Sequence, residues 1–288
     1  MGVAVCARLG HAGFSVVAHD RRPDCEAEAR AAGAQWVAET SRLLEAADVL
    51  VTVLPGSAEL EEVMATAIPA LGPDTTWIDM TSADPRRGRE LKERAERRGV
   101  ECLEAALGGG IDAARAGTLQ LFVGGHPEVV TRQRPLLEAL GTIEHVGDHG
   151  AGYLAKLLVN SLWFAQAVAI GEALVLGARE GLDPGHLLGV IQRSAAASEL
   201  VRTHAEDLLS GDYVASYGLD RCCDQLDVVV SLADEHGLPG ELTAAVQRAY
   251  RDALRRYGPV DGELLAVARL EERAGVRVAR DRGAGTDW

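Results

Sequence analysis

A lysine and an asparagine one helical turn apart are the residues best placed to do chemistry in this sequence. Lys156 and Asn160 interrupt a long apolar run over 150–179 that is rich in alanine, leucine and valine. Residues four apart share one face of a helix. Burying an ammonium is costly unless it is paired or loses its proton, and desolvation lowers the pKa of a lysine from about 10.4 toward the range of a general base. The pattern therefore favours proton transfer by Lys156, against the alternative that its amine snorkels to the surface.

A glycine-rich segment is the second candidate, because it can bind an anion through backbone amides. Gly108, Gly109 and Gly110 follow an apolar stretch, and the sequence Ala-Gly-Thr-Leu comes shortly after, over 116–119. Glycines let backbone N–H groups approach a carboxylate closely. A flexible turn is the competing interpretation of this segment.

Asp20 stands where a dinucleotide-binding unit carries an acid. A helix, Gly13 and a predicted strand over 15–19 come before it. An acid at such a strand end binds the ribose 2′-hydroxyl of NAD and repels the 2′-phosphate of NADP, so the sequence favours NAD. Arg21 and Arg22 follow directly and can hold a phosphate instead, and Asp20 alone can be a turn residue.

The glycine fingerprint that normally opens such a unit is incomplete, because only its last glycine, Gly2, has an equivalent here. The first strand and the phosphate loop are therefore expected to be missing from the sequence. A start codon assigned too late is the favoured explanation. A chain that begins at Met1 is expected to bind dinucleotides weakly.

Two other strand ends carry residues suited to a ligand. Leu54 and Pro55 end a predicted strand over 48–54, and Ser82 follows a predicted strand over 76–80. Ligands of α/β sheets bind beyond the carboxyl ends of the strands, so we expect these three residues to bind the cofactor. The Pro-Gly pair after Leu54 also marks an ordinary turn.

The elements that position these residues are of two kinds. Up to residue 148, short β-branched runs alternate with helical patterns, which is typical of βαβ units and a parallel sheet, whereas every later periodic segment is helical. We therefore predict an α/β Rossmann-like domain over 1–148, with its first strand missing, and an all-α domain over 149–275 for substrate binding and dimerisation. A long helix joins them, and 276–288 form a frayed tail. Predicted strands lie over 15–19, 48–54, 76–80, 100–103 and 119–124.

Charge and composition narrow the partners to small molecules. A net charge of −14 opposes nucleic acid and anionic membrane surfaces. The run over 150–179 is long enough to cross a membrane, but Lys156, Asn160, Gln166 and Glu172 favour a buried joining helix and a homodimer or homotetramer. Five cysteines without CxxC spacing predict no metal site, and no signal peptide is expected, which favours a cytoplasmic protein.

Taken in order, these motifs resemble the β-hydroxyacid dehydrogenase family, which includes 3-hydroxyisobutyrate dehydrogenase and is related to 6-phosphogluconate dehydrogenase and the imine reductases. The resemblance implies NAD(P)-dependent hydride transfer to or from a small 3-hydroxy acid or its semialdehyde, in a cleft between two domains. It also implies that Lys156 exchanges the hydroxyl proton and that Asn160 binds the substrate and holds Lys156. The shared pieces span almost the whole chain: Met1-Gly2, Ala12-Gly13, Asp20-Arg21, Leu54-Pro55, Asp79-Met80-Thr81-Ser82, Gly108-Gly109-Gly110, Ala116-Gly117-Thr118-Leu119, Gly152, Lys156 and Asn160.

Two departures from the family's pattern affect the expected substrate. Gly108 stands where the family usually has a serine that helps bind the substrate carboxylate, and the amides of 109–110 are expected to take over. Asp224 stands where the family usually has a lysine, which favours a less acidic or amine-bearing substrate. Arg202 and His204 are candidate substitutes for that lysine. Imine reduction on the same scaffold, and a non-catalytic protein that keeps the fold, are the competing expectations.

Overall fold

The structure is a computed structural model that describes residues 1–215 and 217–279. The chain divides into two compact units, Met1–Lys156 and Leu157–Trp288. We call them the N-terminal and the C-terminal unit. The division falls within the helix α8 (Ala151–Arg179), a few residues after the predicted boundary between 148 and 149.

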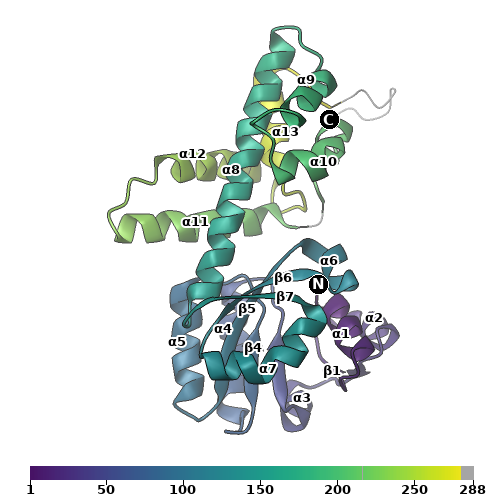
Figure 1. Cartoon of the computed structure of the whole chain (residues 1–288), viewed down its shortest axis with the longest axis vertical. Helices are drawn as coiled ribbons and strands as arrows, with labels where there is room; N and C mark the ends of the chain where they lie inside the picture. Colours follow the sequence, from purple (N-terminus) through teal and green to yellow (C-terminus); the bar gives the residue numbers. More distant parts are fainter. Residues whose placement is uncertain (216, 280–288) are drawn as a thin grey trace. The chain divides into compact units, whose positions relative to one another are not determined.

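The N-terminal unit contains a five-stranded sheet with the order β3-β4-β5-β6-β7 (Figure 1). Its strands are β3 (Val49–Thr52), β4 (Thr76–Asp79), β5 (Glu101–Gly108), β6 (Leu119–Gly124) and β7 (Gly141–Gly147). All neighbours are parallel except β5 and β6, which are antiparallel, so the prediction of a parallel sheet is wrong at this point. The segment 109–118 with its one short helix is too short for a parallel crossover, which needs a dozen or more residues.

A separate parallel pair, β1 (Val17–Ala18) and β2 (Gln35–Trp36), completes the strands of this unit. Val16 beside β1 and Val51 in β3 pack against the same apolar core, although β1 and β3 are not paired with each other. The strands and helices of this unit agree with the predicted Rossmann-like domain.

Helices cover both faces of the five-stranded sheet, as the alternation of side chains along its strands requires. In β4, Ile78 faces a core that contains residues of α1, α6 and α7, and Trp77 faces a core that contains residues of α4 and α5. The helices of this unit are α1 (Gly2–His11), α2 (Cys25–Ala31), α3 (Thr40–Ala46), α4 (Ser57–Ala70), α5 (Pro85–Glu96), α6 (Gly110–Ala116) and α7 (Pro127–Leu140).

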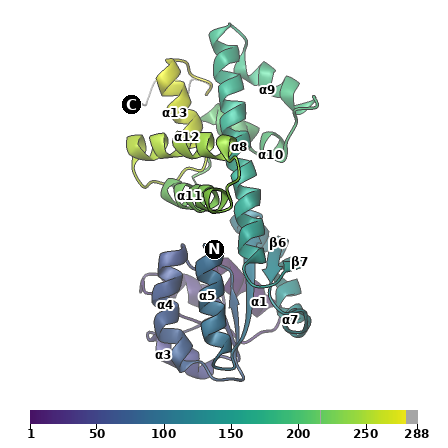
Figure 2. The same cartoon turned by 90° about the vertical axis from the view of Figure 1, so that its left-hand side faces the viewer.

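The C-terminal unit is all-α in its described residues, as predicted (Figure 2). After α8 come α9 (Pro184–Gln192), α10 (Glu199–Ser210), α11 (Leu219–Glu235), α12 (Glu241–Tyr257) and α13 (Leu265–Ala274). The first residues of the predicted tail are not frayed, because the backbone N–H groups of Val278 and Ala279 donate to the Glu271 carboxylate and both side chains are buried. Residues 280–288 of that tail lie outside the described residues.

By length and composition alone, α8 can cross a membrane, but such a helix also occurs in the cores of soluble proteins. Of its most apolar stretch, 39% is buried within the chain. Leu158, Leu162 and Leu176 on this helix are exposed. The homodimer or homotetramer that would cover such a surface stays a prediction.

Candidate functional site

Asp79 fixes the loops that follow β3 and β4, where cofactor-binding residues were expected. Its fully buried carboxylate accepts hydrogen bonds from the hydroxyls of Thr52 and Thr81, each at 2.6 Å. The Thr81 hydroxyl in turn accepts from the backbone N–H of Leu54 at 3.2 Å. The ends of the two strands are thus joined through a single carboxylate, and the start of each loop has a fixed backbone.

A second hydrogen bond ties the same two loops further out. The backbone N–H of Asp84 donates to the Ser57 hydroxyl at 2.8 Å. Between these ties, Pro55 is exposed, and Leu54 and Ser82 are half-buried. The structure therefore brings the predicted residues Leu54, Pro55 and Ser82 together at the carboxyl ends of neighbouring parallel strands.

The first turn of α1 begins at Gly2, which was predicted to bind the cofactor. This helix has no side-chain cap at its N-terminus, so its first backbone N–H groups are available to an anion. A Cβ atom built on Gly2 would meet nothing within 4 Å, which leaves room beside the helix end. The helix packs beside α6, which begins at Gly110 in the glycine-rich segment (Figure 1).

Asp20 is held by the residue that was expected to compete with it. Its Oδ1 accepts from the backbone N–H of Arg22 at 2.8 Å and lies 3.4 Å from the Arg22 Nε. Arg21 is exposed and lies 3.8 Å from Glu62. Asp20, which could accept from a ribose hydroxyl, and the two arginines, which could bind a phosphate, therefore all reach the surface.

The glycine-rich segment needs its glycines for conformation and for space. Gly109 and Gly110 have φ values of 105° and 74°, in the left-handed region that disfavours a side chain. A Cβ atom on Gly108, the last residue of β5, would lie 3.1 Å from the Phe122 ring and 3.3 Å from the Gln120 carbonyl oxygen. Any side chain at position 108 therefore requires a small shift of its neighbours.

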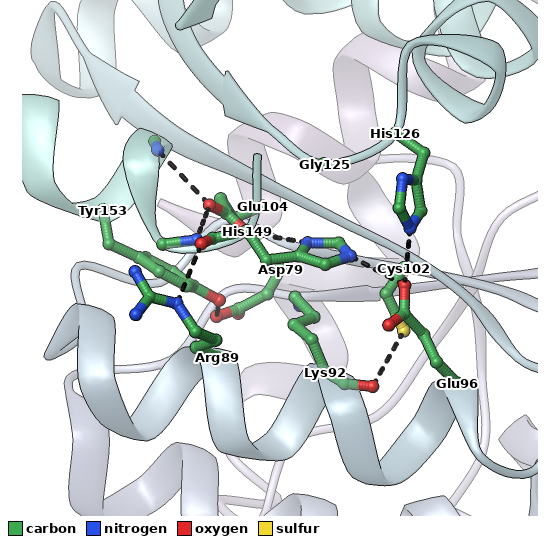
Figure 3. Close-up of polar contacts among 12 residues, drawn as sticks. Asp79, Arg89, Lys92, Glu96, Cys102, Glu104, Gly125, His126, His149 and Tyr153 are labelled. Atoms are coloured by element: carbon green, nitrogen blue, oxygen red, sulfur yellow. Dashed lines mark hydrogen bonds and ion pairs between the residues drawn. The ribbon is translucent and has the colours of Figure 1, made fainter. Parts of the chain in front are cut away.

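Glu104 anchors the first turn of α8, the helix that carries Lys156 (Figure 3). This glutamate is fully buried in β5, and its Oε1 accepts from the backbone N–H groups of Gly150 and Gly152. A Cβ atom on Gly152 would lie 2.5 Å from the Phe122 carbonyl oxygen, so only glycine allows this approach. The anchor sets the position of the half-buried Lys156 one turn further along the helix.

A third contact at the start of α8 joins this anchor to the strand-end loops. Tyr153 is fully buried, and its hydroxyl donates to the Asp79 Oδ2 at 2.5 Å. Burial and the nearby Asp79 charge raise the pKa of Tyr153 well above its ordinary value, so it stays a protonated donor. Hydrogen bonds therefore join the first turn of α8 to the end of β4 and the loop that follows it.

Lys92 places a buried amine next to these two buried acids. Its Nζ lies 3.3 Å from the centroid of the Trp77 ring and has no hydrogen-bond partner among the described residues. Burial lowers the pKa of Lys92, against the attraction of Asp79. Lys92 and Lys156 are the only lysines of the sequence, and the half-buried Lys156 is the more accessible of the two because Lys92 is buried in the core.

Asn160 has a defined partner within the C-terminal unit. Its amide nitrogen donates to the Gln225 Oε1 at 2.7 Å, and the Gln225 amide donates to the Tyr217 hydroxyl at 2.7 Å. Gln225 is buried on α11, so this chain of bonds fixes the orientation of the Asn160 amide. The prediction from the sequence fell on the neighbouring Asp224, whereas Gln225 was not predicted to orient Asn160.

Asp224 and its two candidate substitutes each lie close to a polar partner on the same helix. Asp224 is 67% exposed and lies 3.7 Å from Arg221 on the same helix. The Nδ1 of His204 lies 2.6 Å from the Asp207 Oδ2, and Arg202 lies 3.5 Å from Glu199. Arg202 and His204 therefore each lie beside an acid, so neither matches the free cation that would replace the family's lysine.

Sequence comparison relates both halves of the chain to known dehydrogenases. Residues 1–149 match the profile of the NAD binding domain of 6-phosphogluconate dehydrogenase. Residues 150–270 match the profile described as NAD-binding of NADP-dependent 3-hydroxyisobutyrate dehydrogenase. The chain belongs to the β-hydroxyacid dehydrogenase family.

Individual β-hydroxyacid dehydrogenases support this over most of the chain. The 2-(hydroxymethyl)glutarate dehydrogenase of Eubacterium barkeri is 29% identical over 97% of this chain and 94% of its own length. The 3-hydroxyisobutyrate dehydrogenase of Pseudomonas aeruginosa is 34% identical over 69% of this chain and 68% of its own length. The structure of Mycobacterium tuberculosis 3-hydroxyisobutyrate dehydrogenase with L-serine superimposes with a TM-score of 0.84 at 26% identity, covering 94% of this chain and 95% of that one.

Two buried acids, Asp79 and Glu104, hold the backbone of this β-hydroxyacid dehydrogenase in place. Asp79 and Glu104 are buried away from the predicted ligand positions, yet they hold the strand-end loops and the start of α8. Asp79 belongs to one of the family's motifs but had no predicted role, and Glu104 was not predicted as a site residue. An acid within an apolar strand, as in Thr-Trp-Ile-Asp and Cys-Leu-Glu-Ala, was the available signal.

Proposed function

We propose that this protein is an NAD-preferring dehydrogenase that oxidises the hydroxyl-bearing carbon of a small 3-hydroxy acid, or reduces the matching semialdehyde. The observation that carries the proposal is Lys156, half-buried and held one turn beyond the Glu104 anchor, in a chain whose two halves both belong to one dehydrogenase family. If the protein were not a catalyst, the presence of Lys156 in an otherwise apolar helix would have no functional reason.

The residues of the chain divide the chemistry as follows. A bound nicotinamide ring supplies the acceptor or donor of hydride. Lys156 takes the proton of the substrate hydroxyl during oxidation and returns it during reduction. Asn160, oriented by Gln225, hydrogen-bonds the substrate oxygen. Backbone amides at Gly109 and Gly110 bind the substrate carboxylate in place of the family's serine.

The substrate class follows from Asp224. The Asp224 carboxylate lies 3.7 Å from Arg221 but is 67% exposed, so it can still accept from an ammonium group of a substrate, whereas the family's lysine would attract an anion. We therefore propose that amine-bearing 3-hydroxy acids, of which L-serine is the simplest, are favoured over 3-hydroxyisobutyrate. The similarity to a dehydrogenase solved with L-serine supports the same choice.

A substrate panel tests the function. Reduction of NAD⁺ and NADP⁺ is followed with L-serine, 3-hydroxyisobutyrate and 2-(hydroxymethyl)glutarate, and oxidation of NADH with a semialdehyde and a cyclic imine. We expect NAD⁺-dependent turnover with L-serine above that with 3-hydroxyisobutyrate. Turnover confined to the imine would show an imine reductase, and dinucleotide binding without turnover of any substrate would show a non-catalytic protein.

Asp20→Ser is expected to move the cofactor preference toward NADP by at least about 10-fold in kcat/KM. The substitution removes the charge that repels the 2′-phosphate and releases Arg22 from its hydrogen bonds. The measurement is the ratio of kcat/KM for the two cofactors. Asp24→Ser, at another exposed acid of the same segment, is the matched control and should leave the ratio unchanged. An unchanged ratio in Asp20→Ser would exclude the assigned role.

Asp224→Lys is expected to reverse the substrate preference. With a cation at this position, the anion 3-hydroxyisobutyrate should show a KM lower by about 3-fold or more and L-serine a higher one, and the effect should shrink with added salt. Asp234→Lys makes the same charge change on the same helix, about 15 Å further along, and serves as the control. Equal effects of the two substitutions would mean that only net charge matters.

A further inference from the structure

Three possible metal ligands meet at one point in the N-terminal unit, away from the residues to which the proposed reaction is assigned. They are Glu96 at the end of α5, His126 just before α7 and His149 in the turn before α8 (Figure 3). One ligand atom of each lies within 4.8 Å of those of the other two. We call these residues the Glu96 cluster.

The Glu96 cluster lies toward the opposite end of the sheet from the expected cofactor site. His126 and His149 follow the carboxyl ends of β6 and β7, which run antiparallel to β5. The loops with Leu54 and Ser82 follow the carboxyl ends of β3 and β4, which run parallel to β5. The cluster therefore belongs to no step of the proposed dehydrogenase reaction.

Both imidazoles point at the same carboxylate oxygen. The Nε2 atoms of His149 and His126 lie 2.8 Å and 3.5 Å from the Glu96 Oε1. In a tetrahedral zinc site, with ligand bonds of about 2.0–2.2 Å, neighbouring ligand atoms are about 3.3 Å apart. The two observed distances lie on either side of about 3.3 Å, so small movements of the side chains are enough to make room for a zinc ion between the three ligand atoms.

Glu104 gives His149 the outer partner that metal-binding histidines usually have. The Nδ1 of His149 lies 3.4 Å from the Glu104 Oε2, on the side of the ring away from Glu96. Glu104 is fully buried and is itself held by backbone N–H groups. A carboxylate behind a histidine fixes the ring orientation and makes its other nitrogen a better ligand.

We propose that Glu96, His126 and His149 form a binding site for a divalent metal ion of the zinc class, with one further coordination position open to solvent. Two imidazole nitrogens and one carboxylate oxygen suit Zn²⁺ or Co²⁺, whereas Mg²⁺ and Ca²⁺ prefer oxygen ligands alone. A surface cavity of about 530 Å³, lined by Glu96 and His126, gives an ion access.

A metal at this site would join three segments that are distant in the sequence. The end of α5, the loop before α7 and the turn that starts α8 would be held by one ion. That turn also includes Gly150, whose backbone N–H donates to the Glu104 carboxylate of β5. The consequence is a folded N-terminal unit that is more stable when the ion is bound, without any change in the reacting groups.

The test uses the full chain without an affinity tag, stripped of metal and titrated with Co²⁺ and Zn²⁺. We expect one Co²⁺ per chain with the visible absorption of a tetrahedral or five-coordinate site, displaced by Zn²⁺ but not by Mg²⁺. Saturating Zn²⁺ should raise the Tm by about 5 °C or more. His126→Ala and Glu96→Gln, both at partly exposed side chains, should each weaken binding at least about 10-fold and reduce the shift in Tm at the same Zn²⁺ concentration.

His11→Ala, at an exposed histidine elsewhere in the same unit, is the matched control and should bind like the unmodified chain. Absence of stoichiometric binding in the folded chain would overturn the proposal. Binding that His126→Ala and Glu96→Gln leave unchanged would also overturn it, because the ion would then be held by other residues.

Discussion

Replacing Lys156 by alanine is expected to lower kcat at least about 100-fold while the affinity for NADH stays nearly unchanged. The physical reason is that the substrate hydroxyl then loses its proton without a positioned acceptor, although the cofactor residues at the other loops are intact. The measurement is kcat from steady-state kinetics together with Kd for NADH from equilibrium titration.

Two further substitutions separate proton transfer from charge and from folding. Lys156→Arg keeps the positive charge but cannot lose it, so we expect turnover to stay low. Leu158→Ala changes an exposed residue two positions further along α8 and should leave kcat within about 2-fold. Turnover of Lys156→Ala within about 3-fold of the unmodified enzyme would refute the role assigned to the amine.

Replacing Asp79 by alanine is expected to lower the free energy of unfolding of the N-terminal unit by roughly 3–5 kcal/mol. The substitution leaves the hydroxyls of Thr52, Thr81 and Tyr153 without the acceptor that they share at a site closed to water. It also removes the negative charge that acts most strongly on the buried amine of Lys92. The measurement is hydrogen exchange of the β3 and β4 amides, since a chain of two units need not unfold in one step.

Two further variants serve as references for Asp79→Ala. Asp79→Asn is the conservative variant, and Asp74→Ala is the control. Asparagine keeps the shape and one acceptor oxygen, so its effect should be smaller than that of alanine. Asp74 is exposed in the loop before β4, and its replacement should cost less than about 0.5 kcal/mol. Equal exchange rates in Asp79→Ala and the unmodified protein would show that the carboxylate does not hold the two loops.

The order and type of most elements follow from periodicity, but strand direction does not. The apolar run over 119–124 is the same pattern whether the strand lies parallel or antiparallel to its neighbour, and only the length of the preceding connection decides. The strand β7 alternates only at Thr142, Ile143 and Glu144, which is too short an alternation to predict an edge strand. The strand β2 has only two residues, too few for any pattern.

Some residues of the candidate site could be predicted from the sequence and others could not. Residues that follow strands or interrupt an apolar helix, such as Ser82 and Lys156, could be proposed because their local setting is unusual for their type. The partners of Asp79 and Glu104 could not, since Tyr153 lies 74 positions after Asp79 and Gly150 lies 46 positions after Glu104. Hydrogen bonds over such separations depend on how the sheet and α8 pack, which no local pattern contains.

Rescue of Lys156→Ala by an added amine tests the central claim most directly. Ethylamine supplies the missing functional group as a free base, whereas tetramethylammonium at the same concentration and ionic strength supplies only its charge. The measurement is the rate of NADH formation from the preferred 3-hydroxy acid at saturating NAD⁺. We predict that ethylamine restores turnover by at least about 10-fold and that tetramethylammonium does not. Nearly normal turnover without any added amine would contradict the account.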